Sequence, residues 1–238
     1  GRGAPDWDRP RPGPRAARPF YPCACSESTP PNITGRPLAD RRSRGFDGQL
    51  HPVNPGRSKV QGLRCYPSLA AIGQPVDLAI IGSAVAQVEG VIAEGIAAGM
   101  RAFVVFSSGF AETGEAGRAL QQRLRALAHE SGVPIIGPNC LGLANSATGL
   151  MAPFTTALEE TPLRRGAFGF VSHSGALGAY WMDIVLRSGI GFSQWVTTGN
   201  GCDIDAAEAI PRRCGTACAA SACCWWTAPT TSRPCACT

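Results

Sequence analysis

Apolar runs alternate with amphipathic segments along the middle of the chain, and this alternation restricts the fold more than any other feature of the sequence. Three runs have the length and composition of buried strands, and the two segments between them carry apolar residues at helical spacing. The strand-like runs are 76–83, 101–109 and 133–140, and the helical segments are 85–99 and 114–132. Strands that alternate with helices of this length predict an α/β fold with a parallel, doubly wound sheet covered on both faces.

The same alternation begins again later in the chain. Residues 166–175 are typical of a strand that runs into a turn, residues 176–188 of a helix, and residues 191–200 of a second strand. Two strands are too few for an independent sheet. We therefore interpret this part as the start of a second, truncated α/β domain. One further strand is predicted upstream, at 49–55.

Both ends of the chain depart from this pattern. Residues 1–22, the head, are rich in Arg and Pro, and residues 211–238, the tail, are rich in Cys; neither has a strand or helix period. We interpret both as aberrant segments produced by a frameshift, and the alternative is a disordered head and a disordered tail. The tail lacks the paired C-x2-C spacing of zinc sites, so we expect no metal site there.

Charge and hydropathy exclude several classes of partner. The net charge of +5 arises in the head and the tail, because the residues between them carry one more acid than base. A nucleic-acid-binding surface needs basic residues on folded elements, and we therefore expect no nucleic acid. No apolar run reaches the roughly 18 residues of a membrane span, and the start of the chain does not resemble a signal peptide. We expect a cytoplasmic protein with no membrane partner.

Glycine and small polar residues follow the predicted strands. These loops are Asn54-Pro55, Gly82-Ser83, Ser107-Ser108-Gly109 and Gly137-Pro138-Asn139-Cys140. In open parallel sheets, ligands bind beyond the carboxyl ends of the strands, where backbone N–H groups and helix N-termini favour anions such as phosphates. Four such loops at one edge indicate a nucleotide-like ligand, whereas each loop alone is also explained as a tight turn.

Several motifs, taken in their order and spacing, resemble one known family. The motifs are GFDGQLHPVNP, VDLAIIG, SSGFAETGEAG, GPNCLGLAN, VSHSGALG and GIGFSQWVTTGNGCDID. Over residues 26–210 the chain resembles the α-like region of NDP-forming acyl-CoA synthetases, or ADP-forming acetate–CoA ligases, which belong to the succinyl-CoA synthetase α-subunit superfamily. The resemblance implies a CoA-binding Rossmann-like domain at 23–148 and the start of a succinyl-CoA-ligase-like flavodoxin domain at 149–210.

The resemblance also implies an activity and its partners. The family is an acid–thiol ligase that joins a small carboxylic acid to CoA with a nucleoside triphosphate, through an acyl phosphate and a phosphohistidine. Coenzyme A is a substrate, and ATP or ADP and Mg²⁺ bind to an ATP-grasp subunit or fused domain. The phosphohistidine motif lies beyond the point where this chain loses the pattern, so we expect CoA binding without turnover. The alternative is a non-catalytic CoA- or nucleotide-binding module, such as the regulatory domain of a protein acetyltransferase.

The resemblance places CoA along the loops at the strand ends. The residues that match its CoA-binding positions are Ser26, Gly35, Asn54, Pro55, Ile81, Gly82, Ser83, Ser107, Ser108, Gly109, Asn139 and Cys140. The first Gly-rich turn of the family matches residues 23–26, and no first strand is recognisable in residues 1–22. Cys25 carries a side chain where glycine would let the backbone approach a phosphate.

The turn Ser172-His173-Ser174-Gly175 precedes a predicted helix. In the family this turn presents serine and backbone N–H groups to phosphate, which agrees with the positive end of a helix dipole. Ser172, Ser174 and Gly175 are therefore expected to bind phosphate. His173 is a candidate nucleophile and, alternatively, a polar loop residue, because no orienting carboxylate is close to it in sequence. We expect no catalytic residue in this chain.

Two further side chains invite a chemical interpretation. Cys140 is a candidate catalytic thiol, but without a partner base in the sequence we favour a packing or CoA-contact role. Glu112 precedes a predicted helix, where acids are favoured, and is expected to be structural.

Overall fold

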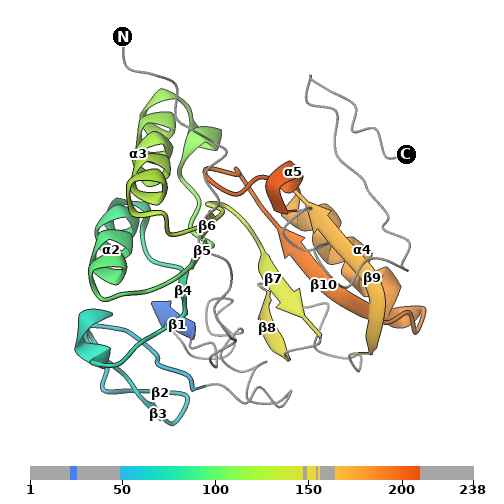
Figure 1. Ribbon diagram of the computed structural model, residues 1–238, viewed down its shortest axis with the longest axis horizontal. Helices are drawn as coiled ribbons and strands as arrows, with labels where there is room; N and C mark the ends of the chain where they lie inside the picture. Colours follow the sequence, from blue (N-terminus) through green and yellow to red (C-terminus); the bar gives the residue numbers. More distant parts are fainter. Residues whose placement is uncertain (1–21, 26–48, 147–148, 154, 156–163, 210–238) are drawn as a thin grey trace.

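Within the residues that the structure describes, the protein forms two four-stranded sheets and one two-stranded hairpin (Figure 1). The computed structural model describes residues 22–25, 49–146, 149–153, 155 and 164–209. The tail, the head apart from Pro22, and the predicted CoA-binding residues Ser26 and Gly35 lie outside the described residues.

The elements follow one another along the chain much as predicted. The strands are β1 (Pro22–Cys25), β2 (Lys59–Val60), β3 (Leu63–Arg64), β4 (Leu78–Ile81), β5 (Phe103–Val105), β6 (Ile135–Ile136), β7 (Gly142–Asn145), β8 (Leu150–Pro153), β9 (Arg165–Ser172) and β10 (Phe192–Thr197). The helices are α2 (Val85–Ala97), α3 (Glu115–Ser131), α4 (Gly175–Arg187) and α5 (Ala206–Ala209), with 3-10 turns η2 (Ala70–Ile72) and η3 (Ala111–Thr113). The three longer helices begin and end within two residues of their predicted bounds.

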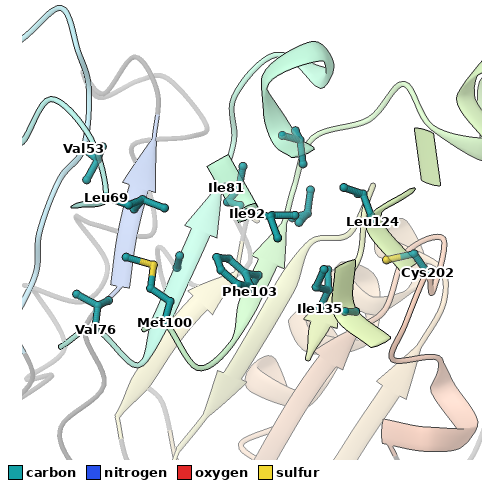
Figure 2. Close-up of a cluster of buried hydrophobic side chains, with 14 of the residues drawn as sticks. Val53, Leu69, Val76, Ile81, Ile92, Met100, Phe103, Leu124, Ile135 and Cys202 are labelled. Atoms are coloured by element: carbon teal, nitrogen blue, oxygen red, sulfur yellow. The ribbon is translucent and has the colours of Figure 1, made fainter. Parts of the chain in front are cut away.

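The first sheet has the order β1-β4-β5-β6, and all its pairings are parallel. One face packs against α2 and α3 through a core that includes Ile81, Ile92, Phe103 and Leu124 (Figure 2). The other face, with Leu78, packs against the second sheet. Burial on both faces explains why β4 and β5 are continuous apolar runs rather than alternating ones. The predicted α/β fold with a parallel sheet is confirmed.

Two predictions about the first sheet are wrong. No first strand was recognised before the turn expected at 23–26, yet Pro22–Cys25 is itself a strand, and its residues pair with β4 from Leu78 to Ile81. Four residues are too few to show a periodicity, so backbone pairing defines this strand. Residues 49–55 were predicted to be a strand, but only Val53 forms an isolated bridge, to Tyr66. Two prolines in this segment lack the N–H that a ladder requires.

The second sheet has the order β8-β7-β10-β9, in which β9 and β10 are parallel and the other pairs are antiparallel. The predicted strands at 166–175 and 191–200 are confirmed as β9 and β10. The expectation of a two-stranded fragment is wrong, because β7 and β8 add two further strands to this sheet. The boundary predicted at residue 148 therefore falls between two paired strands of one sheet.

Helix α4 packs closely on the second sheet. Met182, Val185 and Leu186 contact a core that includes Trp195 of β10. The Trp195 indole Nε1–H donates to the backbone oxygen of Gly178 at 2.9 Å, and this close approach needs glycine, because a Cβ there would lie 2.6 Å from Thr197 Cγ2. The first turn of α4 is thereby held against β10. Among the described residues, no helix has the length and hydropathy needed to cross a membrane.

Candidate functional site

Two cavities lie at the carboxyl ends of the parallel strands. The larger has a volume of about 760 Å³ and lies between loops of the two sheets. The smaller has a volume of about 510 Å³ and lies between the start of α2 and the segment before η2. Gly82, Ser83 and Ala84, in the loop from β4 to α2, line both cavities. The two cavities therefore meet at this loop, which forms part of the wall of each.

Most of the residues predicted to bind CoA line these cavities. Asn54 and Pro55 line the smaller one. Those that line the larger cavity are Gly82, Ser83, Ser107, Ser108, Asn139 and Cys140. The structure thus brings together residues that are up to 86 positions apart in the sequence, from Asn54 to Cys140.

Two predicted residues lie elsewhere. Ile81 has no exposed surface and belongs to the core between the first sheet and its helices. Gly109 lies outside the two cavity linings, and its N–H donates to Glu112 Oε1 at 2.6 Å. These residues shape the loops beside the cavities rather than their walls.

Hydrogen bonds join the cavity loops to one another. The Ser107 hydroxyl donates to the backbone oxygen of Ser83 at 2.6 Å, and the Asn139 N–H donates to the backbone oxygen of Ser107 at 2.9 Å. The loops that follow β4, β5 and β6 are therefore held together without a ligand. A site preformed in this way loses less conformational entropy when a ligand binds.

The hydroxyl of Ser83 is the unpaired polar group of this edge. Ser83 Oγ is buried and has no hydrogen-bond partner among the described residues, although the backbone oxygen of the same residue is bonded. A buried hydroxyl without a partner is costly in free energy. Because Ser83 lines both cavities, this unpaired hydroxyl lies beside their shared wall.

The predicted phosphate-binding turn lies on the larger cavity. Ser174 and Gly175, at the start of α4, line it together with His173. Ser174 is the N-cap of α4, and its hydroxyl accepts from Leu177 N–H at 3.3 Å. The N–H groups of the first helical turn have no intrahelical acceptor, and they form the positive end of the helix dipole. The cavity therefore offers donors to an anion at this position.

Ser172 was predicted to bind phosphate together with Ser174 and Gly175, but it does not lie on the cavity wall as they do. It is buried at the end of β9, and its hydroxyl accepts from Ser174 N–H at 3.0 Å and lies 3.1 Å from the Ser174 carbonyl oxygen. Ser172 is absent from the cavity wall, and it holds the shape of the turn that presents Ser174.

His173 is exposed at the cavity and is oriented by a buried threonine. Its Nδ1 lies 3.0 Å from Thr198 Oγ1, and Thr198 has no exposed surface. A threonine hydroxyl orients an imidazole, but it supplies no negative charge to activate the ring as a nucleophile. The geometry therefore favours a role in binding for His173.

Cys140 is a poor candidate for a nucleophile. It is 3% exposed, and its thiol lies 3.2 Å from the backbone oxygen of Val105. Burial raises the pKa of the Cys140 thiol to about 12, against weaker lowering contributions from the backbone. The thiolate, which is the reactive form, is absent at neutral pH. The packing or contact role predicted for Cys140 is the one that its surroundings favour.

A hydrogen-bonded cluster that sequence reasoning missed connects the two sheets. Asn200, in the loop after β10, donates through Nδ2 to the carboxylate of Glu112 and to Gln121 Oε1. Its Oδ1 accepts from Asn139 Nδ2 at 3.3 Å. Burial raises the pKa of the Glu112 carboxyl, but hydrogen bonds from Asn200 and Gly109 outweigh it, so the pKa lies below its ordinary value. The only sequence signal was the polar TTGN run after a predicted strand.

The larger cavity contains no strong formal charge. Among the described residues that line it there is no Lys, Arg, Asp or Glu, and His173 and Cys140 are its titratable side chains. No group of three potential metal ligands occurs within the described residues. Donors for an anion therefore come from backbone N–H groups, hydroxyls and His173.

Comparisons with known proteins agree with this geometry. Residues 28–146 match the CoA binding domain family, and residues 165–212 match the succinyl-CoA ligase like flavodoxin domain. The chain is 33% identical over 197 residues to acetate–CoA ligase [ADP-forming] II of Archaeoglobus fulgidus, covering 80% of this chain and 29% of the relative. It is 38% identical over 161 residues to the alpha subunit of acetate–CoA ligase [ADP-forming] II of Pyrococcus furiosus, covering 68% and 34%.

Solved structures show the same similarity. A dinucleotide forming acetyl-coenzyme A synthetase 1 of Ca. Korarchaeum cryptofilum, in its apo form, has a TM-score of 0.74 at 32% identity, covering 81% of this chain and 41% of that one. An ATP citrate lyase of Methanothrix soehngenii, solved with citrate and coenzyme A, has a TM-score of 0.59 at 21% identity, covering 76% and 31%, which shows the fold alone. The chain spans about a third of the length of the curated relatives it matches.

Proposed function

Because the chain belongs to the CoA-binding domain family, as the α-like region of the ADP-forming acyl-CoA ligases, we propose that it supplies the CoA site and the phosphate site of an acid–thiol ligase. The observation that carries this proposal is the pair of cavities that meet at Ser83, with the N-terminus of α4 at one end. CoA lies along the strand ends, and inorganic phosphate binds at Ser174 and Gly175.

The position of the two sites fits the first step of the reaction. An oxygen of inorganic phosphate forms a bond to the acyl carbon of acyl-CoA, and the C–S bond breaks. The sulfur leaves with the electron pair and takes up a proton, so the products are an acyl phosphate and CoA. A site that holds phosphate beside the thioester converts an encounter of two molecules into a reaction between neighbours. The donors at the start of α4 hold the phosphate in place.

Later steps require groups that we assign to other parts of the full ligase. The phosphoryl group passes to a histidine and then to ADP, which yields the free acid and ATP. We propose that an ATP-grasp subunit or fused domain holds ADP or ATP with Mg²⁺, since the chain spans about a third of its relatives and one of these is named as an alpha subunit. The structural relative from Ca. Korarchaeum cryptofilum has been solved in complex with phosphate and ADP.

Two further parts of the proposal concern domains and location. We propose a CoA-binding domain formed by the first sheet with α2 and α3, followed by the start of a ligase domain. Cys140 and Cys202 are free thiols, which fits a reducing compartment such as the cytoplasm.

The second candidate function is a non-catalytic CoA- or nucleotide-binding module. The match of residues 165–212 to the ligase-like flavodoxin domain favours the ligase instead. The cavity between the two sheets also favours the ligase, because a binding module for CoA alone does not require a phosphate-binding turn from a second sheet.

Calorimetric titration of the purified chain tests the proposal. CoA is expected to bind saturably with a 1:1 ratio, and NADH is expected to bind much more weakly, because the two ligands share an adenine nucleotide but differ beyond the pyrophosphate. Addition of phosphate is expected to leave CoA bound, since the two ligands occupy different ends of the cavities. A clear preference for NADH would contradict the assignment.

A further inference from the structure

A chain of hydrogen-bonded side chains leads from the elements beside the first sheet to the wall of the larger cavity. Asn139 lines this cavity, and so does Asn200, to which it bonds. Glu112 and Gln121 bond to Asn200 in turn, but they form no part of either cavity wall. The chain therefore has one end that a ligand can meet and one end that lies away from the ligand.

Two acceptors fixed by the backbone form the end away from the cavity. Glu112 Oε1 accepts from the Gly109 N–H at 2.6 Å, and Gln121 Oε1 accepts from the Ala111 N–H at 3.3 Å. Burial raises the pKa of the Glu112 carboxyl, but hydrogen bonds from Asn200 and backbone N–H groups outweigh burial, so the pKa is lowered and the group is ionised at neutral pH. A carboxylate only accepts hydrogen bonds. Both fixed groups therefore require a donor from Asn200.

These two acceptors set the direction of the amides that follow. Asn200 Nδ2 donates to Glu112 and, at 2.9 Å, to Gln121 Oε1. Asn200 therefore presents its Oδ1 to Asn139, and Asn139 Nδ2 donates to it at 3.3 Å. An asparagine side chain has an oxygen and an NH2 group that exchange places when the amide rotates. Here one orientation of Asn139 is selected, and its Oδ1 and second N–H are left for a ligand.

The backbone of the same loops is held independently of these side chains. The Asn200 N–H donates to the backbone oxygen of Pro138 at 2.9 Å. Gly199 packs so closely on this loop that a Cβ would lie 2.3 Å from the Pro138 oxygen and 2.4 Å from the Asn139 oxygen. Removal of the Glu112 carboxylate should therefore leave the loops in place and release only the orientation of the Asn139 carboxamide.

We propose that Glu112 is a positioning residue for CoA, which acts through Asn200 to hold the Asn139 carboxamide in the orientation that pairs with an amide of the pantetheine arm. The proposal rests on the CoA site proposed above. The pantetheine arm contains secondary amides, each with an N–H donor and a carbonyl acceptor, and a carboxamide with a fixed oxygen and N–H is complementary to them. The arm belongs in the larger cavity, because the thioester has to lie beside the phosphate at the start of α4. A carboxamide that is already oriented loses less conformational entropy when CoA binds.

A double-mutant cycle measured with CoA tests this inference. Calorimetric titration gives the Kd of the native chain, of Glu112→Gln, of Asn139→Ala and of the double variant. Asn139→Ala is expected to weaken CoA binding about fivefold, as for the loss of one hydrogen bond. Glu112→Gln is expected to weaken it about threefold, because an amide at position 112 also offers N–H groups and no longer selects one orientation. In the Asn139→Ala background, Glu112→Gln should cause no further change, because the group that Glu112 positions is gone.

Two further variants complete the experiment. Glu115→Gln makes the same chemical change three residues away, at a side chain that is 90% exposed and pairs with Arg118, and it should leave the Kd for CoA unchanged. Gln121→Met removes the other acceptor of Asn200 and is expected to repeat the pattern of Glu112→Gln, so it tests the inference if Glu112→Gln fails to fold. Urea unfolding of each variant separates a loss of stability from a loss of affinity.

The possible results separate the inference from the proposed function. A weaker affinity for CoA in Glu112→Gln that disappears in the Asn139→Ala background supports the inference. An unchanged Kd in Glu112→Gln, or the same weakening in both backgrounds, overturns the inference and leaves the CoA site in place. An unchanged Kd in Asn139→Ala has the same consequence. Absence of saturable CoA binding by the native chain overturns the CoA site, and the inference with it.

Discussion

Replacing Ser83 with alanine should change the stability of the free protein and its affinity for CoA in opposite senses. Ser83 Oγ is buried between the two cavities and has no hydrogen-bond partner in the part of the chain that the structure describes. A buried hydroxyl with no hydrogen bond costs about 1–3 kcal/mol. Because Ser83 borders a cavity, we use the low end of this range of costs. Ser83→Ala should therefore raise the free energy of unfolding by about 1 kcal/mol.

The same hydroxyl is expected to bond to a polar group of CoA. Loss of one neutral hydrogen bond weakens binding by about 1 kcal/mol, which is roughly a fivefold increase in Kd. Urea unfolding of the free chain measures the first effect, and calorimetric titration with CoA measures the second. A more stable but weaker-binding variant is the signature of a polar group that the ligand completes.

Ser107→Ala provides a matched control at the same edge. The Ser107 hydroxyl already donates to the backbone oxygen of Ser83 at 2.6 Å, so its loss should destabilise the free chain by about 1 kcal/mol. The two serine variants should therefore differ in the sign of their effect on stability. If Ser83→Ala destabilises the free chain as much as Ser107→Ala does, Ser83 Oγ has a partner within the protein and the reasoning is refuted.

Three other predictions follow from the same structure. The pKa of Glu112 is lowered in the folded chain, so its carboxylate stabilises the fold above the ordinary pKa of 4.5, and this stabilisation is lost as the pH falls through the folded pKa. In Glu112→Gln, the free energy of unfolding measured with urea should therefore fall less steeply with decreasing pH than in the native chain. With a pKa of about 12, Cys140 should resist iodoacetamide at pH about 8, and rapid labelling in peptide mapping would contradict this. Gly178→Ala should destabilise by about 1–3 kcal/mol through overpacking, whereas Gly90→Ala, whose Cβ meets nothing within 4 Å, should stabilise by up to about 1 kcal/mol.

Periodicity predicted the longer elements because they bury whole faces. Helices α2, α3 and α4 each carry an apolar stripe, and β4 is buried along its whole length. Such signals extend over many residues, so the predicted bounds of these elements lie within two residues of the observed bounds. The loops that follow the strands were predicted for the same reason, since each is bounded by a run that could be recognised.

Elements defined by pairing alone escaped sequence reasoning. Strands β1, β7 and β8 have four residues each, and their pairing partners lie far away or across a short hairpin. Nothing in so short a segment identifies the sheet to which it belongs. For this reason two strands were expected for the sheet that contains β9 and β10, although four are present among the described residues.

The candidate site was predicted where it depends on loops and missed where it depends on tertiary contacts. Eight of the 12 residues expected to bind CoA line the cavities, because strand ends meet at one edge. The bond from Asn200 to Glu112 joins positions 88 residues apart, and the contact of His173 with Thr198 joins two strand ends. Neither pair has a pattern in sequence that could be detected without the fold.

Amide hydrogen exchange of the chain, with and without CoA, tests the central claim most directly. The account predicts slower exchange at the cavity loops that follow β4 and β5, and at residues 54–56, when CoA is bound. The β2–β3 hairpin lines neither cavity, so its exchange should not change. Protection confined to the hairpin, or no protection at the loops at saturating CoA, would contradict a CoA site along the strand ends.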